Sequence, residues 1–351
     1  MIKFSMEHPE EKQHMEQVHT LIESGIVKIG ENAKENPKML DFPEFALGIA
    51  NKDYQARTPF LWNAVYEHFG FDTRNIRLAG DPENSEVIFN SFKKDRKYLG
   101  GDVGVGFKDR AWKIIDEVDP LAREMQAINV VVKEENGILR GYNTDGLGYA
   151  QSVKEKLGER GEQIGGKKVV ILGGGGTANA ISFALAKEGA NLMILNRTAA
   201  KAEDLAERVN TYFRKNIARF GGRELIQDEV RDADLVISVI DDPTSPLDQY
   251  SALGTIELPA TPEHIADNLK EAKQIMESMH RETIISDVML RNQDTATIRE
   301  AKLAGFSTLD GKPMVLNQAI EAFWLVNQKV LEAKNITKEQ VAEVMKQAAG
   351  S

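Results

Sequence analysis

Four consecutive glycines, Gly173 to Gly176, are the residues whose type and spacing point most directly to chemistry. They follow the apolar run Val169 to Leu172 and precede an apolar-periodic helix that contains Ala178. Gly173, Gly175 and Ala178 therefore fill the G-x-G-x-x-G/A pattern of a strand–turn–helix that binds a dinucleotide. The first glycine permits the turn, the second lets the backbone approach a pyrophosphate, and the third position lets the helix pack close to the sheet.

The start of this helix offers unpaired backbone N–H groups to phosphate. We therefore interpret Gly173, Gly174, Gly175, Gly176 and Thr177 as a cofactor-binding turn. A strand–helix–strand unit without a ligand is the alternative. We disfavour it because four glycines are entropically costly in a turn with only a structural role.

The end of the next predicted strand, 192–195, distinguishes between the two nicotinamide dinucleotides. An NAD site usually carries Asp or Glu there for the ribose 2′-hydroxyl, whereas an NADP site carries Arg. Here Asn196, Arg197 and Thr198 follow the strand, and Lys201 comes three residues later. Two cations suit a 2′-phosphate, so the sequence favours NADP over NAD. An ordinary surface arginine at position 197 is the alternative.

Two further residues could handle the proton of an alcohol that such a cofactor oxidises. Lys108 ends a strand predicted over 102–107, and ligands gather at the carboxyl edge of α/β sheets. A lysine acts as acid or base when burial or a neighbour brings its pKa toward neutrality. Asp145 lies in the first turn of a helix predicted over 143–157, where a capping carboxylate is the alternative. Together they suggest a catalytic pair.

Composition bounds the class of protein. The chain has 351 residues, which is long enough for two domains. With 42% hydrophobic and 28% charged residues, its composition is that of a soluble globular protein. Zero cysteines exclude disulfides and a thiolate nucleophile, and the six histidines show no metal-ligand spacing. A net charge of −10 argues against nucleic acid and anionic membranes as partners. We expect a cytoplasmic protein with a small-molecule substrate and no metal.

Strands and helices alternate along the chain, which predicts an α/β fold with parallel sheets in two lobes. A helix is expected over 8–28 and strands over 45–50, 75–79, 127–133 and 138–142, the last two joined by a hairpin at Asn136-Gly137. We expect a helical N-terminal extension over 1–44 and a substrate or catalytic domain over 45–145 with 311–351. The remaining 146–310 should form a doubly wound, Rossmann-type NADP-binding domain.

At this point the chain resembles a known family. GYNTDGLGY at 141–149 resembles N-T-D-G-x-G, a signature of the shikimate dehydrogenase-like family. Five further segments are similar to motifs of that family and follow in the same order. DVGVGFK at 102–108 resembles N-V-T-x-P-x-K, and QAINV at 126–130 resembles G-A-x-N-T. GGGGTAN at 173–179 resembles G-A-G-G-A-x-R, NRTAAKA at 196–202 resembles N-R-T-x-x-[RK]-A, and DGKPMVLNQ at 310–318 resembles D-G-x-x-M-L-x-x-Q. The similarity spans about residues 45 to 330.

The resemblance implies reversible hydride transfer between NADPH and the ring carbonyl or hydroxyl of a shikimate-like or related polyhydroxylated substrate, within aromatic amino acid biosynthesis. It implies that Lys108 and Asp145 act at the reacting hydroxyl. Asn129 and Gln318 would bind substrate. Thr58 and Gly104 occupy two further substrate-binding positions, and Val288 and Gly311 would lie near the nicotinamide.

The chain also departs from the family pattern. Ala56 and Thr58 stand where the family has the Ser-x-Ser that holds a carboxylate. Asp102, Gly104 and Gly106 replace the Asn, Thr and Pro of N-V-T-x-P-x-K. Leu290 replaces the expected tyrosine, and residues 238–240 replace the N-A-T strand end. Losing a hydrogen bond to a charged group costs ~1.5–3 kcal/mol. Asp102, if it lines the pocket, would also repel a carboxylate. A dehydrogenase for another ring substrate and a nucleotide-binding sensor or regulator without turnover are therefore the alternatives.

Two additions lie outside the family pattern. They are an N-terminal arm of about 40 residues and a longer segment over 241–282. Either could cap the active site or form a subunit contact, as in a homodimer. Surface decoration is the alternative.

Overall fold

The computed structural model describes residues 17–30, 41–51, 57–240, 248–290 and 293–350. The chain divides into two compact units, one of Met1–Thr144 with Gln318–Ser351 and the other of Asp145–Asn317. Both units are α/β, as expected. Residues 1–16 of the N-terminal arm, Ala56 and residues 241–247 of the longer segment lie outside the described residues.

The first unit is built on a seven-stranded sheet in the order β1-β3-β2-β4-β6-β7-β5. The strands are β1 (Val27–Ile29), β2 (Glu44–Ala50), β3 (Thr73–Gly80), β4 (Tyr98–Asp102), β5 (Glu117–Val118), β6 (Val130–Lys133) and β7 (Leu139–Tyr142). β2 pairs in parallel with β3 and β4, whereas β1 and β6 run antiparallel to β3 and β4. The sheet of this unit is therefore mixed: the hairpin expected at Asn136-Gly137 is confirmed as the antiparallel pair β6–β7, and the edge strand β1, which was not predicted, is also antiparallel.

The N-terminal arm contributes to this unit. The helix expected over 8–28 is described as α2 (Gln17–Glu23), and Gly25, at a φ of 75°, allows the chain to leave it. β1 follows and pairs Val27 with Gly80. The N–H of Val18 donates to Asp95 Oδ2 at 3.1 Å. The described part of the arm therefore contains a strand as well as a helix, and both pack on the main core.

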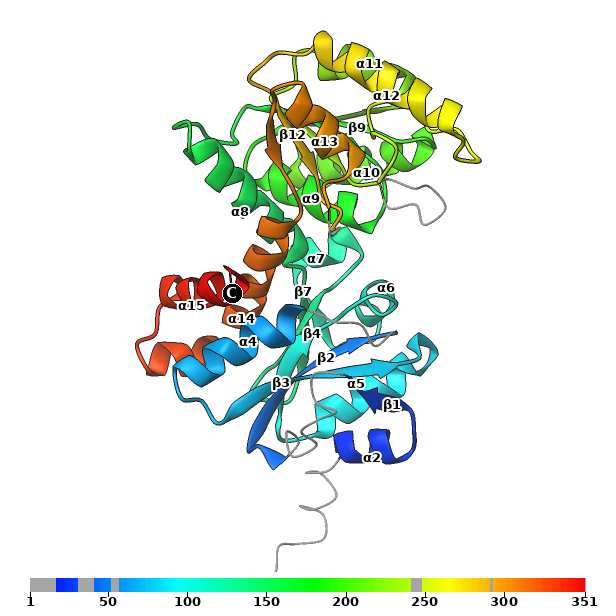
Figure 1. The fold of residues 1–351 in the computed structure, drawn as a ribbon. Helices are drawn as coiled ribbons and strands as arrows, with labels where there is room; N and C mark the ends of the chain where they lie inside the picture. The colour runs from blue at the N-terminus through cyan, green and yellow to red at the C-terminus, as the bar shows by residue number, and fades with distance from the viewer. Residues whose placement is uncertain (1–16, 31–40, 52–56, 241–247, 291–292, 351) are drawn as a thin grey trace, which may run out of the picture. The chain divides into compact units, whose positions relative to one another are not determined.

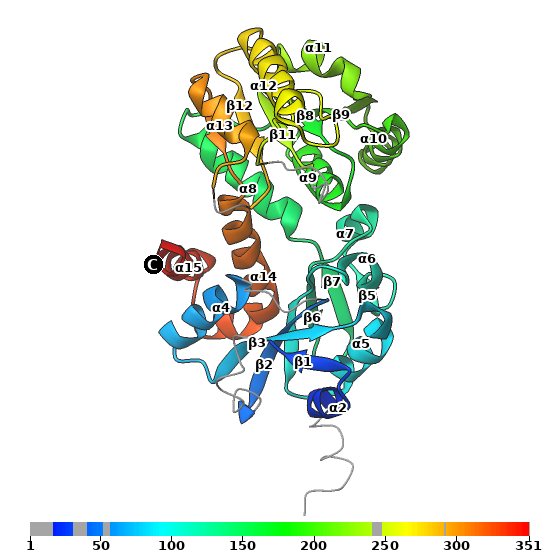
Figure 2. The ribbon, with the colours of Figure 1, turned by 45° about the vertical axis from the view of Figure 1, so that its right-hand side comes forward.

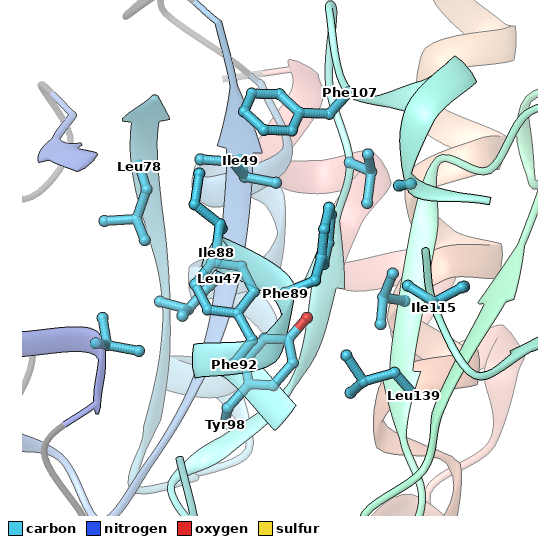
Figure 3. Packing of buried hydrophobic residues seen from close by; sticks show 14 of the residues in the cluster. Leu47, Ile49, Leu78, Ile88, Phe89, Phe92, Tyr98, Phe107, Ile115 and Leu139 are labelled. Carbon is cyan, nitrogen blue, oxygen red and sulfur yellow. The ribbon is translucent and has the colours of Figure 1, made fainter. Parts of the chain in front are cut away.

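Aromatic and aliphatic side chains fill one face of the sheet (Figure 3). Leu47, Ile49 and Leu78 of the sheet pack against Ile88 and Phe89 of α5 (Ser85–Lys94). The short helices η2 (Pro82–Asn84), α6 (Lys108–Ala111) and α7 (Pro120–Met125) connect the strands.

The other face is covered by α4 (Arg57–His68), α14 (Lys312–Ala333) and α15 (Lys338–Gly350) (Figure 1). Trp62 of α4 meets Phe323 of α14 edge to face at 5.4 Å, and its indole N–H donates to the carbonyl of Ala319 at 3.1 Å. The expected capping box of the last helix is confirmed, because Thr337 and Gln340 exchange hydrogen bonds. α14 is thereby fixed to the sheet that carries the candidate substrate residues.

The second unit is a doubly wound sheet of six parallel strands in the order β10-β9-β8-β11-β12-β13. The strands are β8 (Lys168–Leu172), β9 (Asn191–Leu195), β10 (Ala218–Gly221), β11 (Leu235–Ser238), β12 (Ile284–Asp287) and β13 (Ser307–Leu309). The helices are α8 (Asp145–Gly158), α9 (Gly176–Lys187), α10 (Ala199–Phe213), η3 (Arg223–Leu225), α11 (Ile226–Val230), α12 (Pro262–Glu277) and α13 (Ala296–Leu303). α11, α12 and α13 pack on one face, and α8 and α9 lie on the other (Figure 2). None of the helices in the described part of the chain is long and apolar enough to cross a membrane.

Candidate active site

A buried polar network in the first unit joins two of the expected substrate-binding residues. The side-chain oxygen of Asn129 accepts the N–H of Thr144 at 2.7 Å, and its amide donates to Thr144 Oγ1 at 3.0 Å and Gln318 Oε1 at 3.2 Å. The Thr144 hydroxyl donates to the carbonyl of Gln318 at 3.1 Å. Asn129 and Gln318, which are 189 positions apart in the chain, therefore meet beside Thr144.

Lys108 does not end a strand. β4 stops at Asp102, and Gly106, at a φ of 88°, turns the chain so that Lys108 begins α6. The carbonyl of Lys108 accepts the N–H of Ile128 at 3.1 Å, which fixes Lys108 next to the residue that precedes Asn129. Its side chain is half-buried. The strand expected over 102–107 is thus shifted, but Lys108 still lies in the neighbourhood of the Asn129 network.

Asp145 lies in the first turn of α8, as the sequence predicts, although the helix begins at Asp145 itself and not at 143. It follows Thr144 directly. The bonds of Thr144 to Asn129 therefore fix the point where the chain enters this helix. Behind it, a Cβ at Gly146 would lie 2.2 Å from the carbonyl oxygen of Ala180, so only glycine lets α8 pack this closely on α9. Lys108 belongs to the first unit and Asp145 opens the second, and their pairing stays a prediction.

Two further expected positions lie on the first unit. Thr58 sits in the first turn of α4, which begins one residue earlier at Arg57. Gly104 follows β4, and its N–H donates to the carbonyl of Ile49 at 2.7 Å. Asp102 forms an ion pair with Arg77 at 2.7 Å, so it does not face the site as an uncompensated anion.

The glycine turn of the second unit has the geometry of a phosphate cradle. Gly173 has a φ of 134°, and a Cβ there would lie 2.8 Å from Val239 Cγ2, so the position requires glycine. Gly175, Gly176 and Thr177 are exposed, and a Cβ at either glycine would meet nothing within 4 Å. No described side chain caps α9, whose first N–H groups are available to an anion. These residues fit a dinucleotide pyrophosphate.

The residues expected to hold the 2′-phosphate gather beside this turn. A Cβ at Gly174 would lie 3.3 Å from Asn196 Cγ and 3.4 Å from Lys201 Cβ. The Asn196 amide donates to the carbonyl of Thr198 at 3.0 Å, and Arg197, Thr198 and Lys201 are exposed. Two exposed cations next to the glycine turn suit the phosphate of NADP.

Sequence reasoning missed Arg223 at the same edge. Gly221 pairs with Leu195, so Arg223 and Arg197 each lie two residues beyond adjacent parallel strands. Arg223 Nη2 donates to the carbonyls of Ala252 at 3.1 Å and Gly254 at 2.6 Å. Burial lowers the pKa of Arg223, and the positive charge of Arg197 lowers it further. The position of Arg223 just after β10 could have indicated a place at this sheet edge, but β10 was not predicted from the sequence.

Val288 and Gly311, the two residues that the resemblance implies for the nicotinamide, lie next to each other. A Cβ at Gly311 would lie 2.3 Å from the carbonyl oxygen of Val288, and the N–H of Val288 donates to the carbonyl of Ser238 at 3.1 Å. A hollow of about 70 Å³ next to them is lined by residues that include Leu290 and Thr295.

Asp287 ends β12 at the same sheet edge and was also missed. Its carboxylate accepts the N–H of Met289 at 3.0 Å and the hydroxyl of Thr295 at 2.9 Å. Burial raises the pKa of Asp287 to about 6, although these hydrogen bonds favour the charged form. The sequence signal was an acid at the end of an apolar strand.

Comparisons with known proteins give a consistent result. The family model of the shikimate dehydrogenase substrate binding domain matches residues 49–131, and that of shikimate / quinate 5-dehydrogenase matches residues 154–256. The NADP(+) shikimate dehydrogenase of Methanosarcina acetivorans is 32% identical over 270 residues, which cover 76% of this chain and 87% of the relative. That of Aquifex aeolicus is 28% identical over 270 residues, covering 77% and 86%.

Solved structures share the fold. A shikimate 5-dehydrogenase from Listeria monocytogenes, crystallised with shikimate and NAD, has a TM-score of 0.69 at 24% identity, covering 86% of this chain and 96% of that chain. The shikimate dehydrogenase from Aquifex aeolicus has a TM-score of 0.64 at 25% identity, covering 86% and 97%.

Proposed function

Because the chain belongs to the shikimate dehydrogenase family of NADP-dependent oxidoreductases, we propose that it catalyses the reversible oxidation of a ring hydroxyl on shikimate or a closely related polyhydroxylated ring. The observation that carries the proposal is the Asn129–Thr144–Gln318 network. It brings the amide side chains of Asn129 and Gln318 together beside the backbone of Lys108, and it directly precedes Asp145.

When bound, NADP would supply the redox chemistry, as the hydride acceptor in oxidation and, as NADPH, the hydride donor in reduction. Lys108 removes the hydroxyl proton during oxidation, so a C–H and an O–H bond break while the C=O bond forms. In the reverse direction Lys108 returns that proton to the carbonyl oxygen. Asp145 holds the ammonium group of Lys108 or the reacting hydroxyl in place.

The second unit would hold the cofactor through three sets of residues. The N–H groups of Gly174, Gly175, Gly176 and Thr177 would bind the pyrophosphate, while the Asn196–Lys201 segment would bind the 2′-phosphate. Val288 and Gly311 would flank the nicotinamide.

The experiment that tests this function uses the purified full-length chain. Shikimate, quinate and the neutral methyl ester of shikimate are each supplied with NADP or NAD, and reduced cofactor is followed by its absorbance. We expect turnover of at least one ring hydroxy acid with NADP preferred over NAD. Tight NADPH binding without turnover of any ring substrate would instead support a sensor or regulator.

The cellular location and the oligomeric state complete the proposal. The chain contains no cysteine, which fits the reducing cytoplasm as its location. A homodimer, formed through the N-terminal arm or through the 241–282 segment, is a further prediction. Sedimentation of the full chain and of a chain with substituted exposed residues of α12 tests the second of these contacts.

A further inference from the structure

An arginine outside the cofactor-binding motifs lies at the carboxyl edge of the second sheet. Arg223 follows β10, and Gly221, the last residue of β10, is paired with Leu195, the last residue of β9. The N–H of Asn196 also donates to the carbonyl of Gly221 at 3.2 Å, so the two strands stay side by side as they end. Arg197 and Arg223 therefore leave the sheet at the same level, from strands whose backbones are about 4.8 Å apart.

This edge of the sheet adjoins the glycine turn. Asn196 lies against Gly174, since a Cβ at Gly174 would come within 3.3 Å of Asn196 Cγ. Arg197 and Lys201 are exposed beside it, and Arg223 is partly exposed. Three cations therefore gather where the ribose 2′-phosphate of the cofactor is expected.

The Arg223 guanidinium is held through one of its nitrogens. Nη2 donates to the carbonyl of Ala252 at 3.1 Å and to that of Gly254 at 2.6 Å. Among the residues that the structure describes, Nε and Nη1 have no hydrogen-bond partner, and the guanidinium forms no ion pair. These donors are therefore not committed to another part of the described chain.

The two carbonyls belong to a turn that is itself fixed. Asn268 of α12 accepts the N–H of Ser251 at 2.8 Å and donates to the carbonyls of Ser251 at 3.0 Å and Thr255 at 2.9 Å. The N–H of Ala252 donates to Thr297 Oγ1 at 2.9 Å. The turn thereby orients the guanidinium before any ligand binds, and a preorganised group loses little conformational freedom on binding.

Holding this turn does not by itself require a positive charge. Burial lowers the pKa of Arg223 most, the carboxylate of Glu271 raises it, and the positive charge of Arg197 lowers it, so both groups lie within electrostatic reach. The oxygens of Glu271 already accept the N–H and the hydroxyl of Thr255, at 2.6 and 3.2 Å. A phosphate bound to both guanidinium groups would remove their repulsion through strong, charge-assisted hydrogen bonds.

We propose that Arg223 is a third cation of the 2′-phosphate site and a residue that determines specificity for NADP; the inference rests on the cofactor site proposed above. Arg197 and Lys201 belong to the segment that resembles N-R-T-x-x-[RK]-A, whereas Arg223 follows the next strand of the sheet and lies outside that segment. Nη2 of Arg223 holds the turn at residues 252–254, which leaves Nη1 to donate to the phosphate.

The test compares two ligands that differ only in the 2′-phosphate. Adenosine 2′,5′-bisphosphate and adenosine 5′-monophosphate are titrated by calorimetry into the full-length wild-type chain, Arg223→Met and Arg223→Gln. Loss of one hydrogen bond to a charged group predicts a rise in Kd of about 10- to 100-fold for the bisphosphate and of less than about 3-fold for the monophosphate. The matched control is Arg219→Met, an exposed arginine of β10 that pairs with Glu229, and it should leave both Kd values unchanged.

Arg223→Gln separates recognition from folding, because its amide can still donate to the turn but carries no charge. It should melt within a few degrees of wild type and still lose the preference for the bisphosphate. Equal losses for the two nucleotides, or an unchanged Kd for the bisphosphate, would overturn the inference. Unfolding of Arg223→Gln would assign the guanidinium to the turn alone and would overturn it as well, as would a wild-type chain without preference for the bisphosphate.

Nucleotide titration needs no turnover, so the inference and the proposed function fail separately. A chain that binds the bisphosphate through Arg223 but oxidises no ring substrate contradicts the proposed function alone. A chain that oxidises shikimate with NADP and keeps its preference for NADP over NAD in Arg223→Gln contradicts the inference alone.

Discussion

Thr144 donates its backbone N–H to the side-chain oxygen of Asn129 at 2.7 Å, and Asp145 is the next residue in the chain. The bond ties Thr144, the last residue of this segment of the first unit, to the residue before β6. A catalytic carboxylate on a helix terminus needs such support, because small displacements of reacting groups lower rates steeply. Asn129 anchors the residue before Asp145, and in the proposed site it would also bind substrate.

Replacement of Asn129 by leucine should reveal both roles. The N–H of Thr144 would lose its buried acceptor, which costs about 1–3 kcal/mol in the free energy of unfolding. We expect kcat/KM to fall by more than the remaining folded fraction explains. Denaturant unfolding and steady-state kinetics measure the two effects, with the exposed Gln347→Ala as control. An unchanged kcat/KM would show that the network has no part in catalysis.

Replacement of Lys108 by alanine should abolish most of the turnover. General acid–base groups contribute about 10²–10⁴ in rate, so kcat should fall by that factor while NADPH binding stays unchanged. Lys113→Ala, at an exposed position just beyond α6, is the matched control. Activity of Lys108→Ala within a few-fold of wild type would remove Lys108 from the mechanism.

The local parts of the fold were predictable from the sequence. The glycine turn, the hairpin at Asn136-Gly137 and the last capping box each depend on a few neighbouring residues, and the structure contains all three. The strand before Lys108 was misplaced because Val103 and Val105 alternate with glycines, and such alternation is typical of a strand. The turn at Gly106 depends on its positive φ of 88°, which the sequence does not show.

Features that depend on pairing between distant segments were missed. β1, β10 and β13 have only three or four residues each, too few to show a period, and they form because a neighbouring strand offers an edge. The ion pair of Arg77 on β3 with Asp102 on β4 depends on the strand order, which the sequence does not show.

Reversal of charge at Arg197 should change cofactor preference. Arg197→Asp would repel the 2′-phosphate of NADP and could accept the 2′-hydroxyl of NAD. We expect the ratio of kcat/KM for NADP to that for NAD to fall by at least about 10-fold, the effect of 1.4 kcal/mol. Lys215→Asp, an exposed change beyond α10, controls for net charge. A constant ratio would contradict the assignment of the 2′-phosphate site.

The buried carboxyl of Asp287 should make stability depend on pH in an identifiable window. Its pKa is raised from 3.8 to about 6 by burial, so the folded chain binds this proton more tightly than the unfolded chain does. The stabilisation is fully present below pH 4 and is lost as pH rises to about 6, by about 3 kcal/mol. Asp287→Asn removes the titration, so the variant should gain stability over wild type across that interval, measured by urea unfolding at each pH. Asp294→Asn, an exposed acid nearby, should track wild type. A constant difference between Asp287→Asn and wild type from pH 4 to 7 would show that Asp287 does not titrate there.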